Sequence, residues 1–230
     1  FSERGVDEVV KKHIGRLNNV VTFYEMYADS HTKTLPVNLH VLDQWILTRL
    51  VELSREVTRA MDAYELDRAT RPFADFIDDM STWYLRRSRD RFKSPEEKKQ
   101  ALATTEYVLF TLSKLLAPFM PFFAEDIYSR VKSDHDPKSV HLCAWPDLSS
   151  VVGRLASPKS IKNIIPLMAE VRNISSLGLE ARSRAKVNVR QPLQSITVRQ
   201  GRGSSVSEHE SLMSLIRDEV NVKAISWRIE

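Results

Sequence analysis

The fold is decided by LDQWILTRLVELSREVTRAMDAYELDRATRPFADFIDDMSTWYLRRSRDRF, residues 42–92. Apolar residues recur every three or four positions over residues 42–61 and again over residues 69–84. This spacing places them on one face of a helix, and it predicts two successive amphipathic helices. Pro72 is compatible with the second helix only in its first turn.

The helical pattern continues on both sides of this stretch. We expect further helices over residues 6–28, 94–116, 122–131 and 161–184. Ser94 and Glu97 have the spacing of a capping box, with Pro95 at the first helical position. Residues 30–38 and 133–160 contain prolines and no clear periodicity, so we expect them to be irregular.

The texture of the sequence changes near its end. Apolar and polar residues alternate over 193–199 and 222–229, which predicts two half-buried strands. A loop rich in Gly and Ser (201–207) and a helix (208–219) separate them. The predicted fold class is therefore mainly α, with a helical bundle over residues 1–186 followed by a small α/β appendage over residues 187–230.

Composition excludes several classes of protein. The chain is 42% hydrophobic and 28% charged, with a formal net charge of +4, which is ordinary for a water-soluble domain. No apolar run is long enough to cross a bilayer, so we expect no membrane partner, and a content of one cysteine fits a cytoplasmic location. Cys143 is the only cysteine, which excludes an internal disulfide and a zinc site built on cysteine pairs. A start at Phe1, without an initiator Met or a signal peptide, suggests a fragment of a longer chain.

The most informative local feature is WYLRRSRDRFK, residues 83–93. Arginine forks bind phosphate oxygens, and an aromatic ring can stack on a base or support an arginine. The candidate RNA-binding residues here are Trp83, Arg86, Arg87, Arg89, Arg91 and Lys93. The alternative is a solvated end of a helix, or a set of ion pairs with the acids Asp75, Asp78 and Asp79.

A second basic stretch supplies further candidates and leaves the same alternative open. Its residues are Arg182, Arg184, Lys186 and Arg190. Elsewhere the chain lacks a GxGxxG or Walker sequence, its six histidines show no metal-ligand spacing, and no nucleophile–base pair is evident. We therefore predict no catalytic residue and no metal site.

Several motifs together resemble a known family. Residues 42–92, LLAPFMPFFAEDIY (115–128) and SVHLCAWP (139–146) are similar to the anticodon-binding helical bundle of class Ia aminoacyl-tRNA synthetases. RAKVNVRQPLQSITV (184–198) and DEVNVKAISW (218–227) resemble the isoleucyl enzymes in particular. The His13-Ile14-Gly15-Arg16 sequence resembles the HIGH signature only superficially, because it lies in an amphipathic helix and lacks the last histidine.

The resemblance implies a function for the longer protein. Such an enzyme uses ATP and Mg²⁺ to attach isoleucine to its tRNA, and it edits misactivated valine. Its catalytic and editing domains would precede Phe1, so this chain is expected to hold no cofactor and to be inactive alone. The implied partners are isoleucine tRNA and the catalytic domain of the same chain. Two alternatives remain: the same region of a valyl or leucyl enzyme, and a helical protein-interaction module without RNA.

Overall fold

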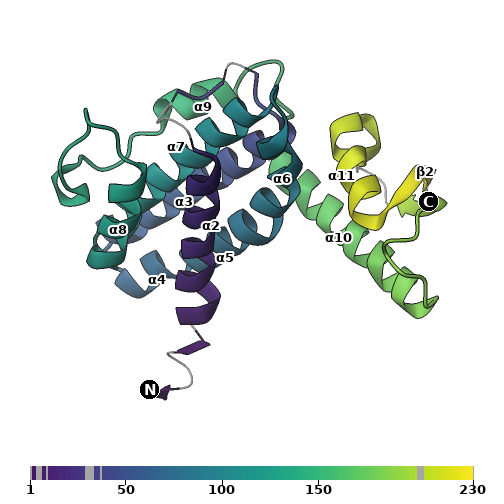
Figure 1. Ribbon diagram of the computed structural model, residues 1–230, viewed down its shortest axis with the longest axis horizontal. Coiled ribbons are helices and arrows are strands. Elements are labelled where there is room, and N and C mark those ends of the chain that lie inside the picture. The colour runs from purple at the N-terminus through teal and green to yellow at the C-terminus, as the bar shows by residue number, and fades with distance from the viewer. Residues whose placement is uncertain are drawn as a thin grey trace. The chain divides into compact units, whose positions relative to one another are not determined.

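The computed structural model describes residues 2–3, 7–8, 10–28, 34–36, 38–200 and 205–229 (Figure 1). Within these residues the chain is mainly helical and ends in a pair of strands, which confirms the predicted fold class. The predicted loops lie in part outside the described residues, at 30–33, 37 and 201–204. Contacts divide the chain into two compact units, Phe1–Ser160 and Ile161–Glu230.

The first unit is a bundle of helices. It surrounds a core of buried side chains in which Trp45, Tyr84 and Phe92 are among the largest. In chain order its elements are η1 (Val10–Ile14), α2 (Gly15–Tyr27), α3 (Val41–Asp62), α4 (Leu66–Thr70), α5 (Pro72–Asp78), η2 (Asp79–Leu85), α6 (Arg86–Lys93), α7 (Lys98–Leu116), α8 (Pro121–Val131), η3 (Val140–Leu142) and α9 (Ser149–Leu155).

Helix α3 is the long helix that residues 42–61 predict. Ile46, Leu50 and Val57 lie on its buried side, four and then seven residues apart, which brings them onto one face of the helix. The face enters the core because burying apolar area is the main favourable contribution to folding. The prediction is confirmed within one residue at each end.

The second predicted helix is longer than expected and contains a π-helical turn. Helix α5, the π turn η2 and helix α6 follow one another without a break over residues 72–93. Pro72 occupies the first position of α5, as its missing N–H requires. A π turn adds one residue to a helix, so it rotates the following side chains by about 100° relative to an uninterrupted α-helix. Helical spacing therefore cannot be carried through η2 to decide which side of α6 is buried.

Two local predictions in this unit are wrong. Helix α7 begins at Lys98 and has no side-chain cap, because Ser94 instead ends α6: its N–H donates to carbonyls of that helix. The Ser94 carbonyl then accepts from the N–H of Lys98 at 2.9 Å. Residues 133–160 also contain η3 and α9, which are too short to show a helical period in the sequence.

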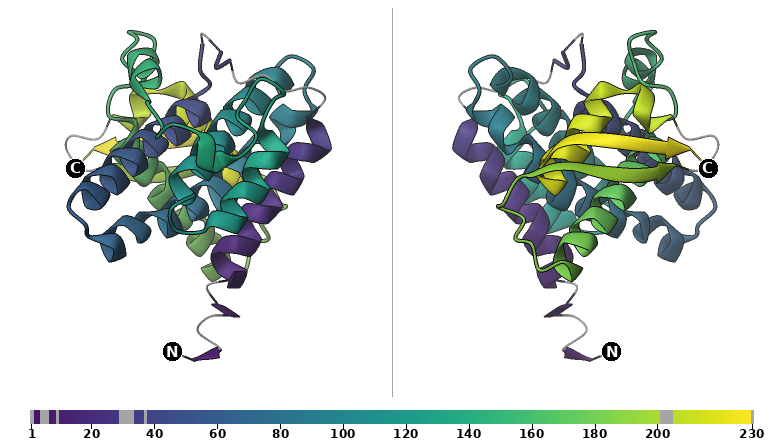
Figure 2. Two further views of the ribbon diagram at one scale, coloured as in Figure 1. Left: turned by 90° about the vertical axis from the view of Figure 1, so that its left-hand side faces the viewer. Right: turned by 90° about the vertical axis from the view of Figure 1, so that its right-hand side faces the viewer.

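The second unit joins one long helix to a strand–helix–strand motif. Helix α10 (Ile164–Arg184) is followed by β1 (Leu193–Gln200), η4 (Val206–Glu208), α11 (Glu210–Val220) and β2 (Val222–Ile229). The strands pair in parallel, with Leu193 opposite Val222, and lie side by side in the right panel of Figure 2. Parallel neighbours need a crossover connection, which α11 supplies. The strands and the helix between them lie where the alternation predicts them.

The division between the units lies before α10, at residues 160 and 161. The sequence predicts a domain boundary at residues 186 and 187, where helical spacing gives way to strand alternation. The structure shows a close approach that the sequence does not reveal: a Cβ added at Gly178 of α10 would lie 2.8 Å from the side chain of Val220 in α11. Helix α10 therefore packs with the elements that follow it.

Candidate nucleic-acid interface

Trp83 and Arg86 form the start of the basic surface on α6. The guanidinium of Arg86 lies 5.9 Å from the centroid of the Trp83 ring, within the range of a cation–π interaction. Its Nε also donates to the carbonyl of Thr82 at 2.9 Å. Trp83 is half-buried and Arg86 is exposed, so the indole supports a guanidinium that still faces solvent.

Arg89 and Lys93 are also exposed on α6, whereas Arg87 is half-buried. The side chain of Arg89 has no hydrogen-bond or ion-pair partner among the described residues. The Lys93 Nζ lies 3.9 Å from the Asp90 carboxylate, and both side chains are open to water. An exposed pair of this kind contributes at most about 1 kcal/mol, so it does not remove Lys93 from contact with an anion.

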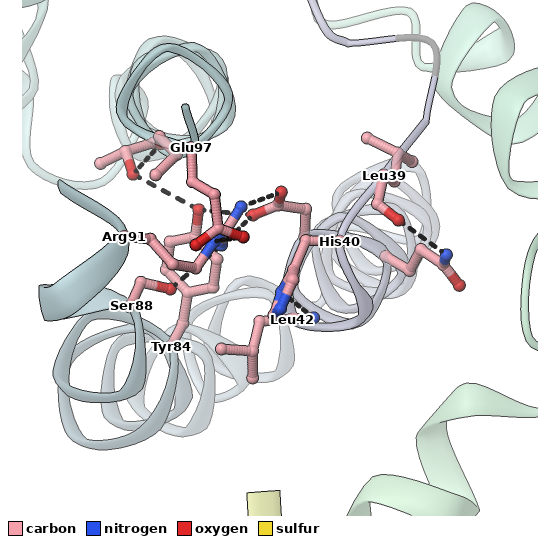
Figure 3. A network of polar contacts seen from close by, with 11 residues as sticks. Leu39, His40, Leu42, Tyr84, Ser88, Arg91 and Glu97 are labelled. Atoms are coloured by element: carbon pink, nitrogen blue, oxygen red, sulfur yellow. Dashed lines mark hydrogen bonds and ion pairs between the residues drawn. The ribbon is translucent and has the colours of Figure 1, made fainter. Parts of the chain in front are cut away.

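Arg91 differs from its neighbours because it points into the core. Only 5% of it is exposed, and Asp43 at the start of α3 is fully buried. Its two terminal nitrogens bind the two carboxylate oxygens of Asp43 at 2.9 and 2.7 Å (Figure 3). This bidentate geometry is the strongest form of an arginine–carboxylate interaction. Arg91 therefore belongs to the core and not to the exposed basic surface of α6.

The Asp43–Arg91 pair is the centre of a larger polar network (Figure 3). The Tyr84 hydroxyl donates to Asp43 at 2.9 Å, and burial raises the pKa of Tyr84 well above its usual range. The Nδ1 of His40 accepts the N–H of Leu42 at 3.2 Å and so caps α3. Burial, and next the charge of Arg91, lower the pKa of His40. The network ties the first turn of α3 to η2 and α6, and thereby fixes the helix that presents the basic surface.

The acidic residues before the basic stretch have partners on other helices. Asp78 pairs with Arg16 of α2. Asp79 accepts from the Nε of Arg49, on α3, at 2.8 Å. These pairs fasten η2 and the end of α5 to α2 and α3, which adds to the hold on α6.

In the second basic stretch, Arg182 is also a buried residue, with 3% of its surface exposed. Among the described residues, its guanidinium donates to four backbone carbonyls, those of Val220, Asn221, Asn188 and Gln191, at 2.7 to 3.0 Å. Arg182 therefore connects the end of α10 to the end of α11 and to the loop that leads into β1. Its donors are already used in holding this loop.

The remaining three residues of this stretch are exposed. Arg184 pairs with Glu180 at 2.6 Å, one turn earlier on α10. Lys186 has a φ of 55°, in the left-handed region, at the end of α10. Arg190 follows in the loop that Arg182 holds, and its backbone N–H donates to Asn188 Oδ1 at 2.9 Å. These three side chains are open to solvent at the surface of the second unit.

Sequence reasoning missed the residues that hold α6, above all Asp43 and His40. An aspartate in the first turn of a helix usually faces solvent and interacts with the helix dipole, so the position of Asp43 in its helix argued against burial. A polar residue between apolar neighbours was the one signal: Asp43 lies between Leu42 and Trp45, both of which are buried.

Comparison with known proteins places this arrangement in a family. Residues 43–197 match the family described as the anticodon-binding domain of tRNA ligase. The chain belongs to this family of tRNA ligase anticodon-binding domains. The matched span includes both basic stretches, the Asp43–Arg91 pair and Arg182.

Individual relatives of this anticodon-binding domain are isoleucine–tRNA ligases. The chain is 36% identical to that of Chlamydia trachomatis serovar L2 over 99% of its length, and 37% identical to that of Chlamydia muridarum over 99%. The enzyme of Chlamydia pneumoniae is 35% identical over 98%. The chain spans 22% of the length of each of these relatives.

Two further findings concern metal sites and membrane-spanning helices in this anticodon-binding domain. In the described part of the chain, no three His, Cys, Asp or Glu side chains come together as a metal site. No described helix is long and apolar enough to cross a membrane.

Proposed function

We propose that this chain is the tRNA-binding region of an isoleucine–tRNA ligase, and that α6 provides its main grip on the RNA. The family match carries the proposal, because it covers residues 43–197 and so includes α6. The relatives named above support isoleucine as the amino acid. The tRNA anticodon stem and loop would be the ligand.

The exposed cations of α6 suit a phosphate backbone. Arg86 and Arg89 offer guanidinium forks, and Lys93 offers a point charge one turn further on. Arg87 and Trp83 complete the surface, with the indole holding Arg86 rather than stacking on a base. Because the network around Asp43 fixes α6, these donors lose little freedom on binding, which favours affinity.

The exposed cations after α10 are the second part of the proposed grip. Arg184, Lys186 and Arg190 would contact the RNA, while Arg91 and Arg182 position the two basic surfaces from within. In the whole protein, ATP and Mg²⁺ would act in a catalytic domain outside this chain. We expect the chain alone to show no isoleucine-dependent exchange of pyrophosphate into ATP.

Filter binding of residues 1–230 to isoleucine tRNA, at several salt concentrations, tests the proposal. The double variant Arg86→Gln/Arg89→Gln should weaken binding. It should also reduce the magnitude of the slope of log K against log salt by about two, one for each phosphate contact that is lost. Lys138→Gln is the control, since Lys138 is an exposed cation between α8 and η3, outside both basic stretches. Absence of salt-sensitive tRNA binding by the wild-type chain would instead indicate a protein-interaction module.

A further inference from the structure

A hollow lies in the first unit between α3 and α9. Its volume is about 630 Å³, within the range of about 300–1,000 Å³ that is usual for sites of small ligands. One wall is the second half of α3, and the other is the segment that leads into α9. Four polar side chains of α3 line the hollow with the i, i+3, i+4, i+7 spacing of one helix face: Arg55, Thr58, Arg59 and Asp62.

The second wall is held against α3 by contacts on both sides of Pro146. Before this proline, the indole Nε1 of Trp145 donates to Thr58 Oγ1 at 2.8 Å. After it, Leu148 and Val151 are buried, with 8% and 0% of their surfaces exposed. The hollow is therefore formed before a ligand arrives, which favours affinity because no segment has to be ordered on binding.

Two arginines of the hollow have unused hydrogen-bond donors. Arg55 and Arg59 are exposed and lie one turn apart on α3. Neither has a hydrogen-bond or ion-pair partner in the described parts of the chain. Arg49, Arg68 and Arg71, by contrast, each pair with a carboxylate. Two guanidinium groups on neighbouring turns, both without a carboxylate, suit the oxygens of a phosphate group.

Two carboxylates also line the hollow, and they differ in what they can still accept. Both oxygens of Asp147 accept from Ser149, one from its N–H at 2.9 Å and one from its hydroxyl at 3.0 Å. Asp62 is exposed and has no such donor among the described residues. The hollow thus offers donors for an anion at Arg55 and Arg59 and an acceptor for hydroxyl groups at Asp62. A ligand that carries both a phosphate and hydroxyl groups meets these requirements.

We propose that this hollow binds one unpaired nucleotide of an RNA. Arg55 and Arg59 would contact its phosphate, and Asp62 would accept from a ribose hydroxyl. The base would lie against Pro146 and Val152, the half-buried apolar side chains of the second wall. The inference rests on the proposed function, and it adds to the grip on α6 a site that a paired nucleotide cannot enter. Both arginines lie outside the two basic stretches found in the sequence.

The position of the hollow favours RNA over a free nucleotide, which offers the same chemistry. Helix α3 begins in the network that fixes α6 (Figure 3). Arg55 lies 12 residues beyond Asp43 on α3, or about 18 Å along the helix axis. A stacked strand of about five nucleotides covers this length at a rise of roughly 3.4 Å each. A strand that contacts α6 is therefore long enough to reach the hollow.

The test compares two RNAs: the anticodon stem–loop of isoleucine tRNA, and a duplex of the same stem without unpaired nucleotides. The whole chain is used with the double variant Arg55→Gln/Arg59→Gln, in which glutamine keeps a good helix former on α3. We expect its affinity for the stem–loop to fall about tenfold and its affinity for the duplex to change much less. Arg86→Gln/Arg89→Gln should weaken binding of both RNAs, because it removes phosphate contacts.

Two further variants separate the hollow from its charge. Arg68→Gln/Arg71→Gln removes two exposed arginines from α4 of the same unit and should bind the stem–loop nearly as wild type does. Val152→Phe fills the hollow without a change of charge and should weaken binding of the stem–loop. The melting temperature of Arg55→Gln/Arg59→Gln should equal that of wild type, since these arginines have no partner within the described residues. A clear fall would show that they serve the fold, and would overturn the inference.

Protection from phenylglyoxal, which modifies exposed arginines, shows directly which ligand occupies the hollow. The stem–loop should protect Arg55 and Arg59 and leave Arg68 and Arg71 reactive. Adenosine 5′-monophosphate is the probe for a free nucleotide. If this nucleotide protects Arg55 and Arg59 and the stem–loop does not, the RNA assignment is wrong.

The outcomes distinguish this inference from the proposed function. If the wild-type chain binds neither RNA at any salt concentration, the proposed function fails and this site fails with it. If Arg86→Gln/Arg89→Gln weakens binding while Arg55→Gln/Arg59→Gln binds the stem–loop like wild type, only the hollow is wrong. If Arg55→Gln/Arg59→Gln weakens binding of stem–loop and duplex equally, these arginines contact paired RNA, and the assignment of an unpaired nucleotide is wrong.

Discussion

Arg91 in the first unit and Arg182 in the second are both buried, yet their charges are accommodated in different ways. Arg91 faces the carboxylate of Asp43 through two hydrogen bonds. In the part of the chain that the structure describes, the hydrogen-bond partners of Arg182 are backbone carbonyls and include no carboxylate. Two of these carbonyls lie at the end of α11, where the helix dipole is negative.

The difference decides whether the loss of each arginine can be compensated by a substitution at a second site. A buried ion pair costs desolvation on both sides, so replacing both partners with neutral groups can be nearly harmless. Backbone carbonyls cannot be replaced by mutation, so nothing compensates for the loss of Arg182. Removal of Arg91 should therefore be reparable at a second site, and removal of Arg182 should not.

The largest effect is expected for Arg91→Met. The substitution leaves the Asp43 carboxylate buried and unpaired, which should lower the free energy of unfolding by about 3–5 kcal/mol. Adding Asp43→Asn should recover much of this loss, because the amide is neutral and still accepts from the Tyr84 hydroxyl. Urea unfolding followed by circular dichroism measures both variants.

Asp43→Asn alone serves as the control for this pair. It should also be destabilising, since the buried Arg91 guanidinium then loses its bidentate partner and keeps the carboxylate of Glu97, 3.9 Å from its Nε. If the loss of stability in the double variant equals the sum of the losses in the two single variants, the pair is not coupled. The expectation that a second substitution compensates for the loss of Arg91 would then be wrong.

A smaller effect is expected for Arg182→Met. Up to four carbonyls lose their charged donor, and we expect a cost of about 2–3 kcal/mol because water can reach some of them. Hydrogen exchange should rise in the loop 188–191 and at the end of α11, and remain unchanged around α6. Arg184→Met, two positions later in the same helix and exposed, is the matched control. Unchanged protection of the loop in Arg182→Met would show that Arg182 does not hold it.

The sequence predicted the local features of these two sites and missed the contacts between residues that are far apart along the chain. Helical spacing and strand alternation located α3, α10, β1 and β2, because these patterns are local and record which face is buried. The basic stretches were also visible. The burial of Arg91 was not, since its partner lies 48 positions away and η2 changes the rotation of the helix between them. Arg182 depends on a backbone geometry that no side-chain pattern encodes.

The stability of the first unit is expected to depend on pH through His40, which lies beside the Asp43–Arg91 pair. Burial and the charge of Arg91 hold the pKa of His40 below its ordinary value of 6.5. Stability from neutral His40 is thus complete above pH 6.5 and is lost as the pH falls through the lower folded value. Protonation of Nδ1 would also remove the cap that His40 provides for the N–H of Leu42.

The expected result is a fall in the melting temperature between pH 7.5 and 5.5. His40→Asn, which keeps a capping oxygen but does not titrate here, should flatten this dependence. His135→Asn, at an exposed position in the same unit, should leave it unchanged. Hydrogen exchange should locate the acid-induced loosening at the start of α3 and not in the loop that Arg182 holds. An equal response in wild type and His40→Asn would assign the effect to another group.

The smallest expected effect has the opposite sign and concerns a feature that the two units share. Tyr64 after α3 and Lys186 after α10 both have φ in the left-handed region, 59° and 55°. Both end their helices with the same pair of bonds; for Tyr64 these are its own N–H to the carbonyl of Met61 and the N–H of Glu65 to that of Ala60. Glycine usually occupies this position, because a side chain there is strained.

Tyr64→Gly should therefore stabilise the chain. The left-handed conformation costs a non-glycine residue about 1–2 kcal/mol, which glycine would relieve. The greater freedom of glycine in the unfolded chain lowers stability by about 0.4–1 kcal/mol and so cancels part of this gain. A net gain of roughly 0.5 kcal/mol remains, and nothing offsets it, since the Tyr64 side chain is 91% exposed. Lys186→Gly should give a similar gain in the second unit. Ala63→Gly is the control: its φ is −88°, so glycine should destabilise there by about 0.5–1 kcal/mol. Urea unfolding resolves these signs, and a loss of stability in Tyr64→Gly would mean that the tyrosine makes a stabilising contact despite its exposure.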